Sequence, residues 1–278
     1  MGIKIKTGLK KCLLVLGSRA CRINKRPIFV MGNQKAGTTV VAALLGQAAG
    51  VNATLDITRA ISNKSFTLHL RYGLEDISVF VKRYRWEFSK EIIKEPGLTF
   101  VWDKLAECFP EASYVFVQRD PRDNIRSLLN RLKVPGHLPE INPKEYEELN
   151  KKNAWRLALD STWLGCPSNT YIEALAYRWV VATEAYQRNA NKTVLVRYED
   201  FKVDKVGTIQ RLVETCGLEA RFDISDKVDV QHQSKGQSQV KWDEFFGLAN
   251  LTRIEEICGP FMTDFGYRLS AERRKALT

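Results

Sequence analysis

The residues best suited to chemistry begin with a glycine loop that carries a lysine, Gly32-Asn33-Gln34-Lys35-Ala36-Gly37-Thr38-Thr39. An apolar run, Ile28 to Met31, precedes the loop, and apolar residues at helical spacing follow it from Val40. The first pattern predicts a short buried strand of a parallel sheet, and the second predicts a helix. Main-chain N–H groups converge where a glycine loop enters a helix, and the helix dipole favours negative charge there. The stretch therefore predicts a cradle for an anion.

The loop has the glycine spacing of the nucleotide P-loop, G-x4-G-K-[ST], but its lysine is displaced. The residue after Gly37 is Thr38, and the lysine stands inside the loop at Lys35. In an ordinary ATP or GTP site the lysine after the second glycine reaches the β- and γ-phosphates. The displacement argues against such a site and favours a single terminal anionic group. The alternative interpretation is a glycine turn with a solvated lysine.

A second basic position follows a second apolar run. Residues 113–118 predict a buried strand, which runs directly into Arg119-Asp120-Pro121-Arg122-Asp123. Asp120 as N-cap and Pro121 at the first helical position predict a helix start, and Ser127 lies two turns into that helix. Ligands of open α/β sheets bind at the carboxyl ends of strands, where an arginine and a serine hydroxyl can share one phosphate. The alternative is a helix start with a surface arginine.

Two further stretches carry weaker signals. Residues 193–196 predict a third buried strand, which ends in Arg197-Tyr198-Glu199-Asp200. Farther on, Gln233-Ser234-Lys235-Gly236-Gln237 places a glycine beside a lysine and a serine. Such a loop can wrap a phosphate with a main-chain N–H and a charge, although in isolation it is equally a plain loop.

The rest of the chain predicts helices and one irregular stretch. Residues 51–70 are polar and mixed, and they predict a loop with little regular structure. Residues 74–94 predict one helix, ended by Pro96. Further helices are predicted over residues 99–109, 146–159, 171–188, 203–216 and 251–257.

Length and composition predict a single α/β domain over residues 26–278, preceded by a basic lead-in over residues 1–25. The net charge of +11 over 278 residues indicates an anionic partner, such as nucleic acid, a membrane surface or a polyanionic small molecule. Six scattered cysteines without a CxxC pair, and only three histidines, predict no metal site and a reduced, intracellular protein.

The basic N-terminal segment holds one apolar run, Cys12 to Leu16, which is too short to span a bilayer. Lys6 stands where a myristoylation signal has serine or threonine. We expect a cytoplasmic protein. This segment has two interpretations. It is either a basic arm in peripheral contact with an anionic membrane or a solvated lead-in to the first strand.

In their order and spacing, these motifs resemble those of the sulfotransferases that use 3′-phosphoadenosine-5′-phosphosulfate (PAPS). The resemblance covers residues 27–267. It implies an α/β fold of three layers, with a mostly parallel central sheet flanked by helices in the P-loop-like sulfotransferase architecture. It also implies transfer of a sulfuryl group from PAPS to an acceptor hydroxyl or amine, with release of 3′-phosphoadenosine-5′-phosphate (PAP).

The resemblance implies which residues bind the 5′ end of PAPS. Carried over by position, Lys35 and the main chain of Ala36, Gly37, Thr38 and Thr39 hold the 5′-phosphosulfate.

The resemblance also implies which residues bind the rest of the nucleotide. Arg119 and Ser127 hold the 3′-phosphate, and Lys235 and Gly236 close over that same phosphate. Tyr198 lies near the adenine, or has a structural role at its strand end.

The catalytic groups follow the family only in part. Lys94, in a Lys-x-Pro sequence, resembles a family lysine near the sulfuryl group. Cytosolic small-molecule members place a histidine shortly after that lysine, where this chain reads Glu95-Pro96-Gly97. Golgi-type and tyrosyl-protein members use a carboxylate some twenty-odd residues beyond the loop lysine, and Asp56 stands near that place. Asp56 is therefore the first candidate for the general base, with Glu75 and His69 behind it, and a turn-forming aspartate is the alternative.

PAPS carries phosphate groups on two sides of one ribose, so it needs two separate cradles and no metal. A P-loop phosphotransferase using ATP and magnesium would need a lysine after Gly37 and an acidic ligand at a strand end. A non-catalytic protein that binds nucleic acid or anionic lipid would favour basic residues interleaved with exposed aromatics. We expect no nucleic-acid partner and an acceptor that is a carbohydrate, a lipid or a small molecule, in a pocket lined by residues 51–85 and 138–169.

Overall fold

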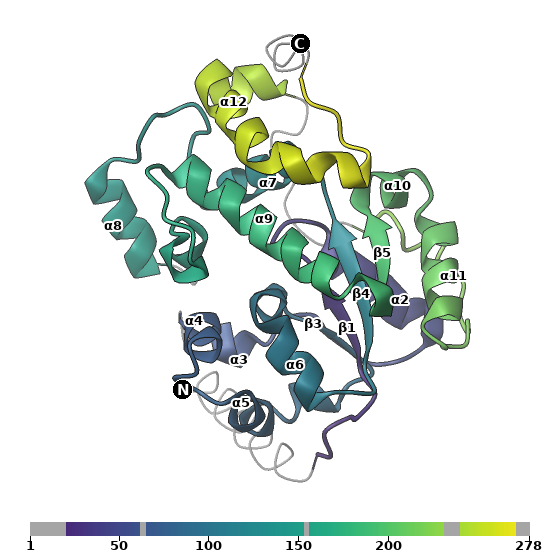
Figure 1. The fold of residues 1–278 in the computed structure, drawn as a ribbon. Coiled ribbons are helices and arrows are strands. Elements are labelled where there is room, and N and C mark those ends of the chain that lie inside the picture. The colour runs from purple at the N-terminus through teal and green to yellow at the C-terminus, as the bar shows by residue number, and fades with distance from the viewer. Residues whose placement is uncertain (1–20, 62–64, 153–155, 231–239, 271–278) are drawn as a thin grey trace, which may run out of the picture.

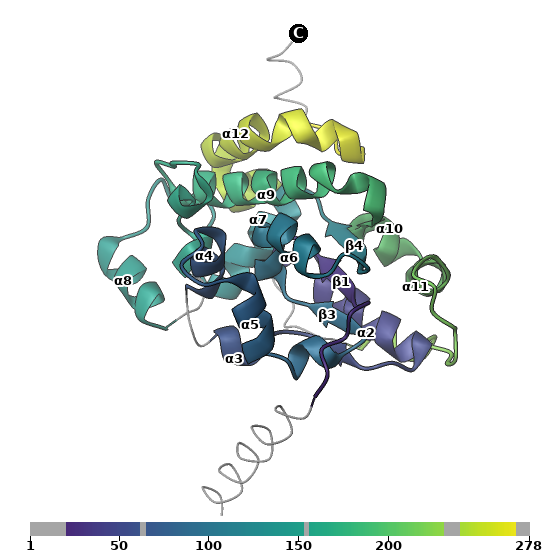
Figure 2. The same cartoon turned by 60° about the horizontal axis from the view of Figure 1, so that its bottom comes forward.

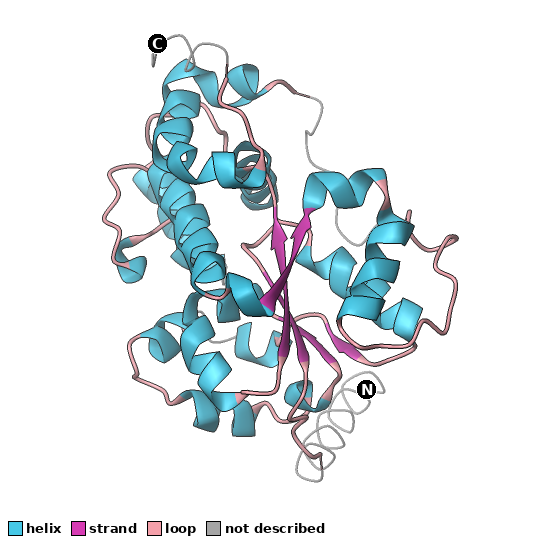
Figure 3. Cartoon of the chain, turned by 45° about the vertical axis from the view of Figure 1, so that its right-hand side comes forward, coloured by secondary structure: helices cyan, strands magenta, loops and turns pink. Residues whose placement is uncertain are grey.

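The computed structural model describes residues 21–61, 65–152, 156–230 and 240–270. At its centre lies a five-stranded sheet with the strand order β2-β3-β1-β4-β5, in which every neighbouring pair is parallel. The strands are β1 (Ile28–Met31), β2 (Ala53–Thr54), β3 (Ile92–Lys94), β4 (Ser113–Gln118) and β5 (Thr193–Arg197). Helices cover both faces of this sheet (Figures 1 and 3). The predicted fold class is confirmed.

Successive residues of β1 point to opposite faces of the sheet. Ile28 and Val30 pack in a core cluster with α2 (Thr38–Ala49) and α11 (Lys205–Thr215). Phe29 and Met31 pack in a second cluster on the other face, which includes residues of α5 (Ile77–Arg83) and α6 (Trp102–Cys108). Because both faces are buried, the strand is apolar at every position rather than at alternate ones.

The remaining helices complete the layers around the sheet. A third core cluster joins α7 (Pro121–Leu132), α9 (Tyr171–Arg188) and α12 (Trp242–Met262), and α9 and α12 lie side by side in both views (Figures 1 and 2). The others are α3 (Thr58–Ile61), α4 (Phe66–Arg71), α8 (Pro143–Lys152) and α10 (Tyr198–Val203), with short 3-10 helices between elements. None of the described helices is both long enough and apolar enough to cross a membrane.

The prediction of one helix over residues 74–94 is wrong. The structure has the short helix α5, a 3-10 turn at Glu87–Ser89, and then the strand β3, which lies between β2 and β1. All three residues of β3 are buried. A buried apolar run this short cannot be told from a helical segment by periodicity, so the helical spacing before it concealed the strand.

Other predicted boundaries also shift. Residues 51–70, expected as loop, contain β2, α3 and α4, and α12 is much longer than predicted, with a non-helical Gly247 inside it. The helix predicted over 203–216 is present as α11, which begins at Lys205 because the Asp204 side chain caps it, and the short helix α10 precedes it. The helix at 171–188 is confirmed as α9. The division into a lead-in and one domain stays a prediction, because residues 1–20 are not described.

Candidate functional site

The glycine loop lies at the carboxyl end of β1, between that strand and α2. Gly32, Lys35 and Gly37 all have positive φ, and Lys35 adopts φ 67 although it is not glycine. A side chain held in the left-handed region is strained, and such strain concentrates at functional sites. The Asn124 side chain accepts a hydrogen bond from Asn33 Nδ2 and donates one to the main-chain oxygen of Gln34, both at 2.9 Å. Helix α7 therefore holds the loop in this shape.

The loop opens onto the N-terminus of α2. The N-cap residue is Gly37, which has no side chain to accept from the first turn. The first N–H groups of a helix find no acceptor inside it, so this end presents donors and a positive dipole end to an anion. Within the loop, the Ala36 N–H donates to Asn33 O at 3.2 Å, so that donor serves the turn itself. Thr38 and Thr39 lie in the first turn, as predicted for the anion cradle.

Tyr198 packs directly on this loop. A Cβ atom at Gly37 would lie 2.3 Å from a carbon of the Tyr198 ring, and the Arg119 guanidinium lies 4.7 Å from the ring centroid. The ring thus fills the space between the loop and Arg119. Tyr198 therefore packs against the loop at the end of its strand, which is one of its two predicted roles. The other role, a position near the adenine of the nucleotide, stays a prediction.

Replacing Gly37 by alanine tests this contact. We expect the free energy of unfolding to fall by about 2–4 kcal/mol, because the new methyl group adds overpacking against Tyr198 to the strain of φ 105. Gly217→Ala is the matched control, since Gly217 has φ 68 and nothing within 4 Å of the new Cβ. Chemical denaturation measures both variants. Equal losses at the two positions would show that Tyr198 does not press on the loop.

The second predicted cradle adjoins the first. Arg119 stands at the carboxyl end of β4, and its NH1 group donates to the main-chain oxygen of Lys35 at 3.0 Å. Its Nε atom is buried and has no hydrogen-bond partner among the residues that the structure describes. A buried N–H without a partner is costly, and an anion bound beside it would satisfy it. The hydrogen bond from Arg119 to the main chain of Lys35 places the two predicted cradles side by side.

Helix α7 presents one face to the loop. Asn124, Ser127 and Arg131 are spaced by three and four residues, so they share that face, and Asn124 contacts the loop directly. Ser127 is half-buried and Arg131 is exposed. The sequence analysis missed Arg131, although its position one turn after Ser127 was a usable signal.

Positive charge gathers around Lys35. Burial, followed in importance by the charges of Arg131, Arg119 and Lys94, lowers the pKa of Lys35 to about 8. These four cationic groups come from the β1 loop, from α7, and from the ends of β4 and β3. Segments far apart in the sequence thus build one strongly positive site.

Lys94 and Asp56 form an ion pair at the edge of this site. The Lys94 Nζ atom lies 2.6 Å from Asp56 Oδ1, and the side chains are 3% and 39% exposed respectively. Of the three candidate bases, Asp56 is the one in contact with Lys94. Glu75 pairs with Arg83 on α5, and His69 lies in α4. Among the described residues, neither makes a hydrogen bond or ion pair to Lys94 or to the loop.

Glu95, which stands where the family pattern led us to seek a histidine, has a structural role. Its Oε1 atom accepts from the Gly97 N–H and its Oε2 atom from the Ile57 N–H, both at 3.1 Å. Burial raises the pKa of this carboxyl group. Glu95 therefore ties the segment that carries Asp56 to the end of β3, which places Asp56 beside Lys94.

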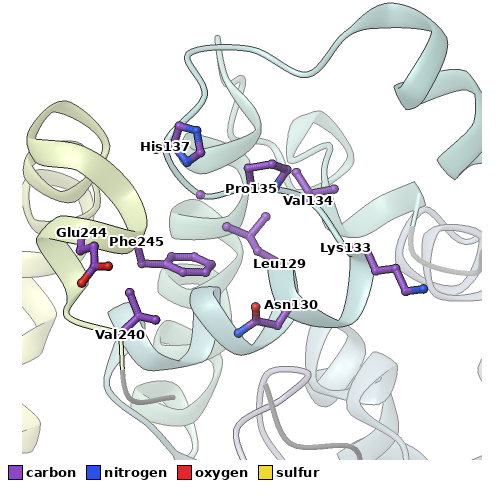
Figure 4. Close-up of a pocket in the computed structure, with 10 residues that line it drawn as sticks. Leu129, Asn130, Lys133, Val134, Pro135, His137, Val240, Glu244 and Phe245 are labelled. Atoms are coloured by element: carbon purple, nitrogen blue, oxygen red, sulfur yellow. The ribbon is translucent and has the colours of Figure 1, made fainter. Parts of the chain in front are cut away.

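Two predicted residues, Lys235 and Gly236, lie outside the described residues, so their closure over a phosphate stays a prediction. A separate cavity of about 590 Å³ lies at the C-terminal end of α7 (Figure 4). Its lining includes Leu129, Lys133 and Phe245, and none of the predicted site residues. In the part of the chain that the structure describes, no group of three His, Cys, Asp or Glu side chains could hold a metal ion.

The sequence model of the sulfotransferase family matches residues 57–223, which is more than half of the chain. The chain belongs to the sulfotransferase family. The predicted resemblance is thereby confirmed at the level of the family. The glycine loop precedes the matched segment, so the roles of its residues depend on their geometry. A search of curated proteins found no match to this sulfotransferase.

Solved sulfotransferases share the fold. Sulfotransferase STF9 from Mycobacterium avium is 14% identical, with 95% of this chain and 82% of that chain covered and a TM-score of 0.51. Sulfotransferase STF1 from Mycobacterium tuberculosis is 14% identical, with coverages of 90% and 81% and a TM-score of 0.50. Mouse SULT7A1, solved in complex with PAP, is 16% identical, with coverages of 94% and 91% and a TM-score of 0.49. The likeness to the two mycobacterial enzymes concerns the fold alone.

Proposed function

We propose that this sulfotransferase transfers a sulfuryl group from PAPS to an acceptor hydroxyl or amine and releases PAP. The observation that carries the proposal is the hydrogen bond from Arg119 to the main-chain oxygen of Lys35 beside a helix N-terminus, where the charges of Arg131 and Lys94 also act on Lys35. PAPS is strongly anionic on two sides of its ribose. A site with cationic groups from several strand ends and from α7 matches that charge distribution.

The residues present fit the donor. Lys35 and the N-terminus of α2, with the main chain of Gly37, Thr38 and Thr39, would hold the 5′-phosphosulfate, while the Ala36 N–H stays bonded to Asn33 O. The Arg119 guanidinium would donate to the 3′-phosphate together with the Ser127 hydroxyl. Arg131 lies one turn from Ser127 and would add its charge to that phosphate.

The catalytic roles follow from the contacts around Lys94. PAPS, when bound, supplies the sulfuryl group, and the acceptor oxygen or nitrogen bonds to sulfur as the bond to the PAP oxygen breaks. Asp56 would take the acceptor proton, and its hydrogen bond from Lys94 orients the carboxylate. Lys35 would stabilise the charge that builds on the bridging oxygen, an effect worth roughly 3–4 kcal/mol for preorganised donors.

A thermal-shift experiment tests the proposal against the phosphotransferase alternative. At a concentration of PAP a hundred times its dissociation constant, binding stabilises the fold by about 2.7 kcal/mol, which raises the melting temperature by roughly 5–10 °C. We expect this rise with PAP in the presence of a chelator. Stabilisation by ATP with magnesium and not by PAP would favour the kinase. Salt-sensitive binding of DNA or vesicles, with neither nucleotide effective, would favour a non-catalytic basic protein.

The pH dependence gives a further prediction. Because the pKa of Lys35 is about 8, its charge is lost as the pH rises through that value. We expect kcat/KM for PAPS, which reports the free enzyme, to fall above pH 8. The fall in kcat should come at higher pH, because a bound anion favours the charged lysine. Lys35→Arg, whose guanidinium stays charged, should remove the step near pH 8. An unchanged step in that variant would assign it to another group.

Two buried aromatic residues pack against Arg178, which contacts the loop. Phe100 and Trp163 pack together in a small core cluster with ring centroids 5.4 Å apart. We propose a carbohydrate, lipid or small-molecule acceptor, and labelled PAPS with a panel of glycans, lipids and phenols would distinguish these classes. A cytoplasmic location and a peripheral contact of the basic N-terminus with an anionic membrane stay predictions.

A further inference from the structure

A buried arginine lies against the glycine loop. The Arg178 side chain, on α9, is 3% exposed. Its Nε atom donates to Gln34 Oε1 at 2.8 Å, and its NH2 group donates to the same oxygen. The guanidinium carbon also lies 4.2 Å from the centroid of Phe100 and 5.5 Å from that of Trp163. Among the described residues, no carboxylate forms an ion pair with Arg178.

This charge is expensive where it lies. Burial lowers the pKa of Arg178 to about 9, and the charge of Glu95 opposes that shift only in part. A buried charge without a counter-ion costs several kcal/mol, and an apolar side chain of similar volume usually serves stability better. Packing alone therefore gives no reason for an arginine at this position. The guanidinium donates from NH1 to the main-chain oxygen of Leu157 at 3.3 Å, and with its other two donors it orients the Gln34 side chain.

The orientation follows from hydrogen-bond chemistry. A guanidinium group only donates, so Gln34 must turn its oxygen toward Arg178 and its amide nitrogen away from it. In the part of the chain that the structure describes, Gln34 Nε2 has no hydrogen-bond acceptor, and it is not among the buried unsatisfied atoms. The main chain of Gln34 is held by Asn124, and the next residue is Lys35. A pair of N–H donors is thus fixed in the loop without a partner among the described residues.

We propose that Gln34 is a further sulfuryl-binding residue of this site, and that Arg178 is the positioning residue that directs the Gln34 amide N–H groups toward the sulfuryl oxygens of the donor. The inference rests on the proposed function. Gln34 directly precedes Lys35 in the loop, and Arg178, which holds its side chain, packs on Phe100 in the 3-10 helix that follows β3. A donor oriented before binding needs no reorganisation during transfer, and it would share the sulfuryl charge with Lys35.

The variant Gln34→Glu separates the two roles of this side chain. A carboxylate accepts from Arg178 at least as well as an amide oxygen does, so the fold and the position of Arg178 are kept. The N–H donors are lost. Because PAP and PAPS have similar negative charge, repulsion by the new carboxylate weakens both ligands. The loss of the donors weakens PAPS alone.

We therefore expect the ratio of PAPS affinity to PAP affinity to fall about tenfold, with an unchanged or higher melting temperature. The turnover number should fall about a hundredfold. Calorimetric titration of both nucleotides gives the ratio without knowledge of the acceptor. Gln47→Glu is the matched control, because Gln47 is exposed on α2 and undergoes the same change of charge.

Variants of Arg178 test the positioning role. Arg178→Met removes the buried charge and leaves the Gln34 amide free to rotate, so kcat should fall about tenfold while PAP affinity stays near that of the wild type. Arg178→Lys returns one donor to Gln34 Oε1 and should recover part of that loss. A purely structural role would instead lower the melting temperature and change the PAP and PAPS affinities together.

The outcomes distinguish the inference from the proposed function. Suppose that the wild type binds PAP and PAPS and that Gln34→Glu has the same ratio of PAPS affinity to PAP affinity. This result would overturn the inference and leave the proposed function standing. Failure of the wild type to bind either nucleotide would overturn both.

Discussion

Replacing Lys35 by alanine is expected to reduce sulfuryl transfer by about a thousandfold and to leave the fold intact. The lysine supplies a charge at the bridging oxygen of the donor, which alanine cannot replace. The fold should tolerate the change because lysine and alanine both have a Cβ atom, so the strain at φ 67 is the same in both. Burial and three nearby cations already disfavour the Lys35 charge, so its removal should not lower the melting temperature.

Lys192→Ala is the control for this variant. Lys192 is exposed and directly precedes β5, at the end of the strand opposite to Arg197 and Tyr198. It should retain wild-type turnover and stability. Turnover near that of the wild type in Lys35→Ala, measured with labelled PAPS, would remove this lysine from the mechanism.

The change Asp56→Asn has the second largest expected effect. We expect turnover to fall by roughly a hundredfold to ten-thousandfold, because the amide cannot take the acceptor proton. PAP affinity should stay close to that of the wild type, since Asp56 acts on the acceptor side. A modest loss of stability is also expected, because the buried Lys94 loses its counter-ion.

Glu75→Gln is the matched control for Asp56→Asn. It also breaks an ion pair of a candidate base, in this case with Arg83 on α5. Steady-state kinetics and thermal melting should show turnover close to the wild-type value for this variant. The opposite result, a loss in Glu75→Gln with normal turnover in Asp56→Asn, would move the general base to Glu75.

The donor side of the site could be predicted from the sequence because its signals are local. The strand, the glycine loop and the helix that follows are consecutive, and Asp120 with Pro121 marks the next helix start within two residues. Asp120 does accept from the Arg122 N–H as an N-cap residue. Signals of this kind survive in any tertiary context, because the chain itself brings their parts together.

The rest of the site depends on contacts between distant parts of the chain. Arg178 and Gln34 are 144 residues apart, and nothing in either local sequence marks them as partners. The strand β3 was not predicted, because the residues before it have helical spacing. The position of Lys94 at a strand end was therefore not predicted either. The pairing of Asp56 with Lys94 likewise required the sheet order that places β2 beside β3. Tertiary packing decides such features, which sequence periodicity does not record.

The central claim is that two groups of cationic residues hold opposite ends of one nucleotide. Calorimetric titration of PAP and of adenosine 5′-monophosphate, which lacks only the 3′-phosphate, tests that claim most directly. With Arg119 and Ser127 on the 3′-phosphate, PAP should bind at least about a hundredfold more tightly, since charge-assisted hydrogen bonds contribute about 1.5–3 kcal/mol each. Equal affinities for the two nucleotides would contradict the claim.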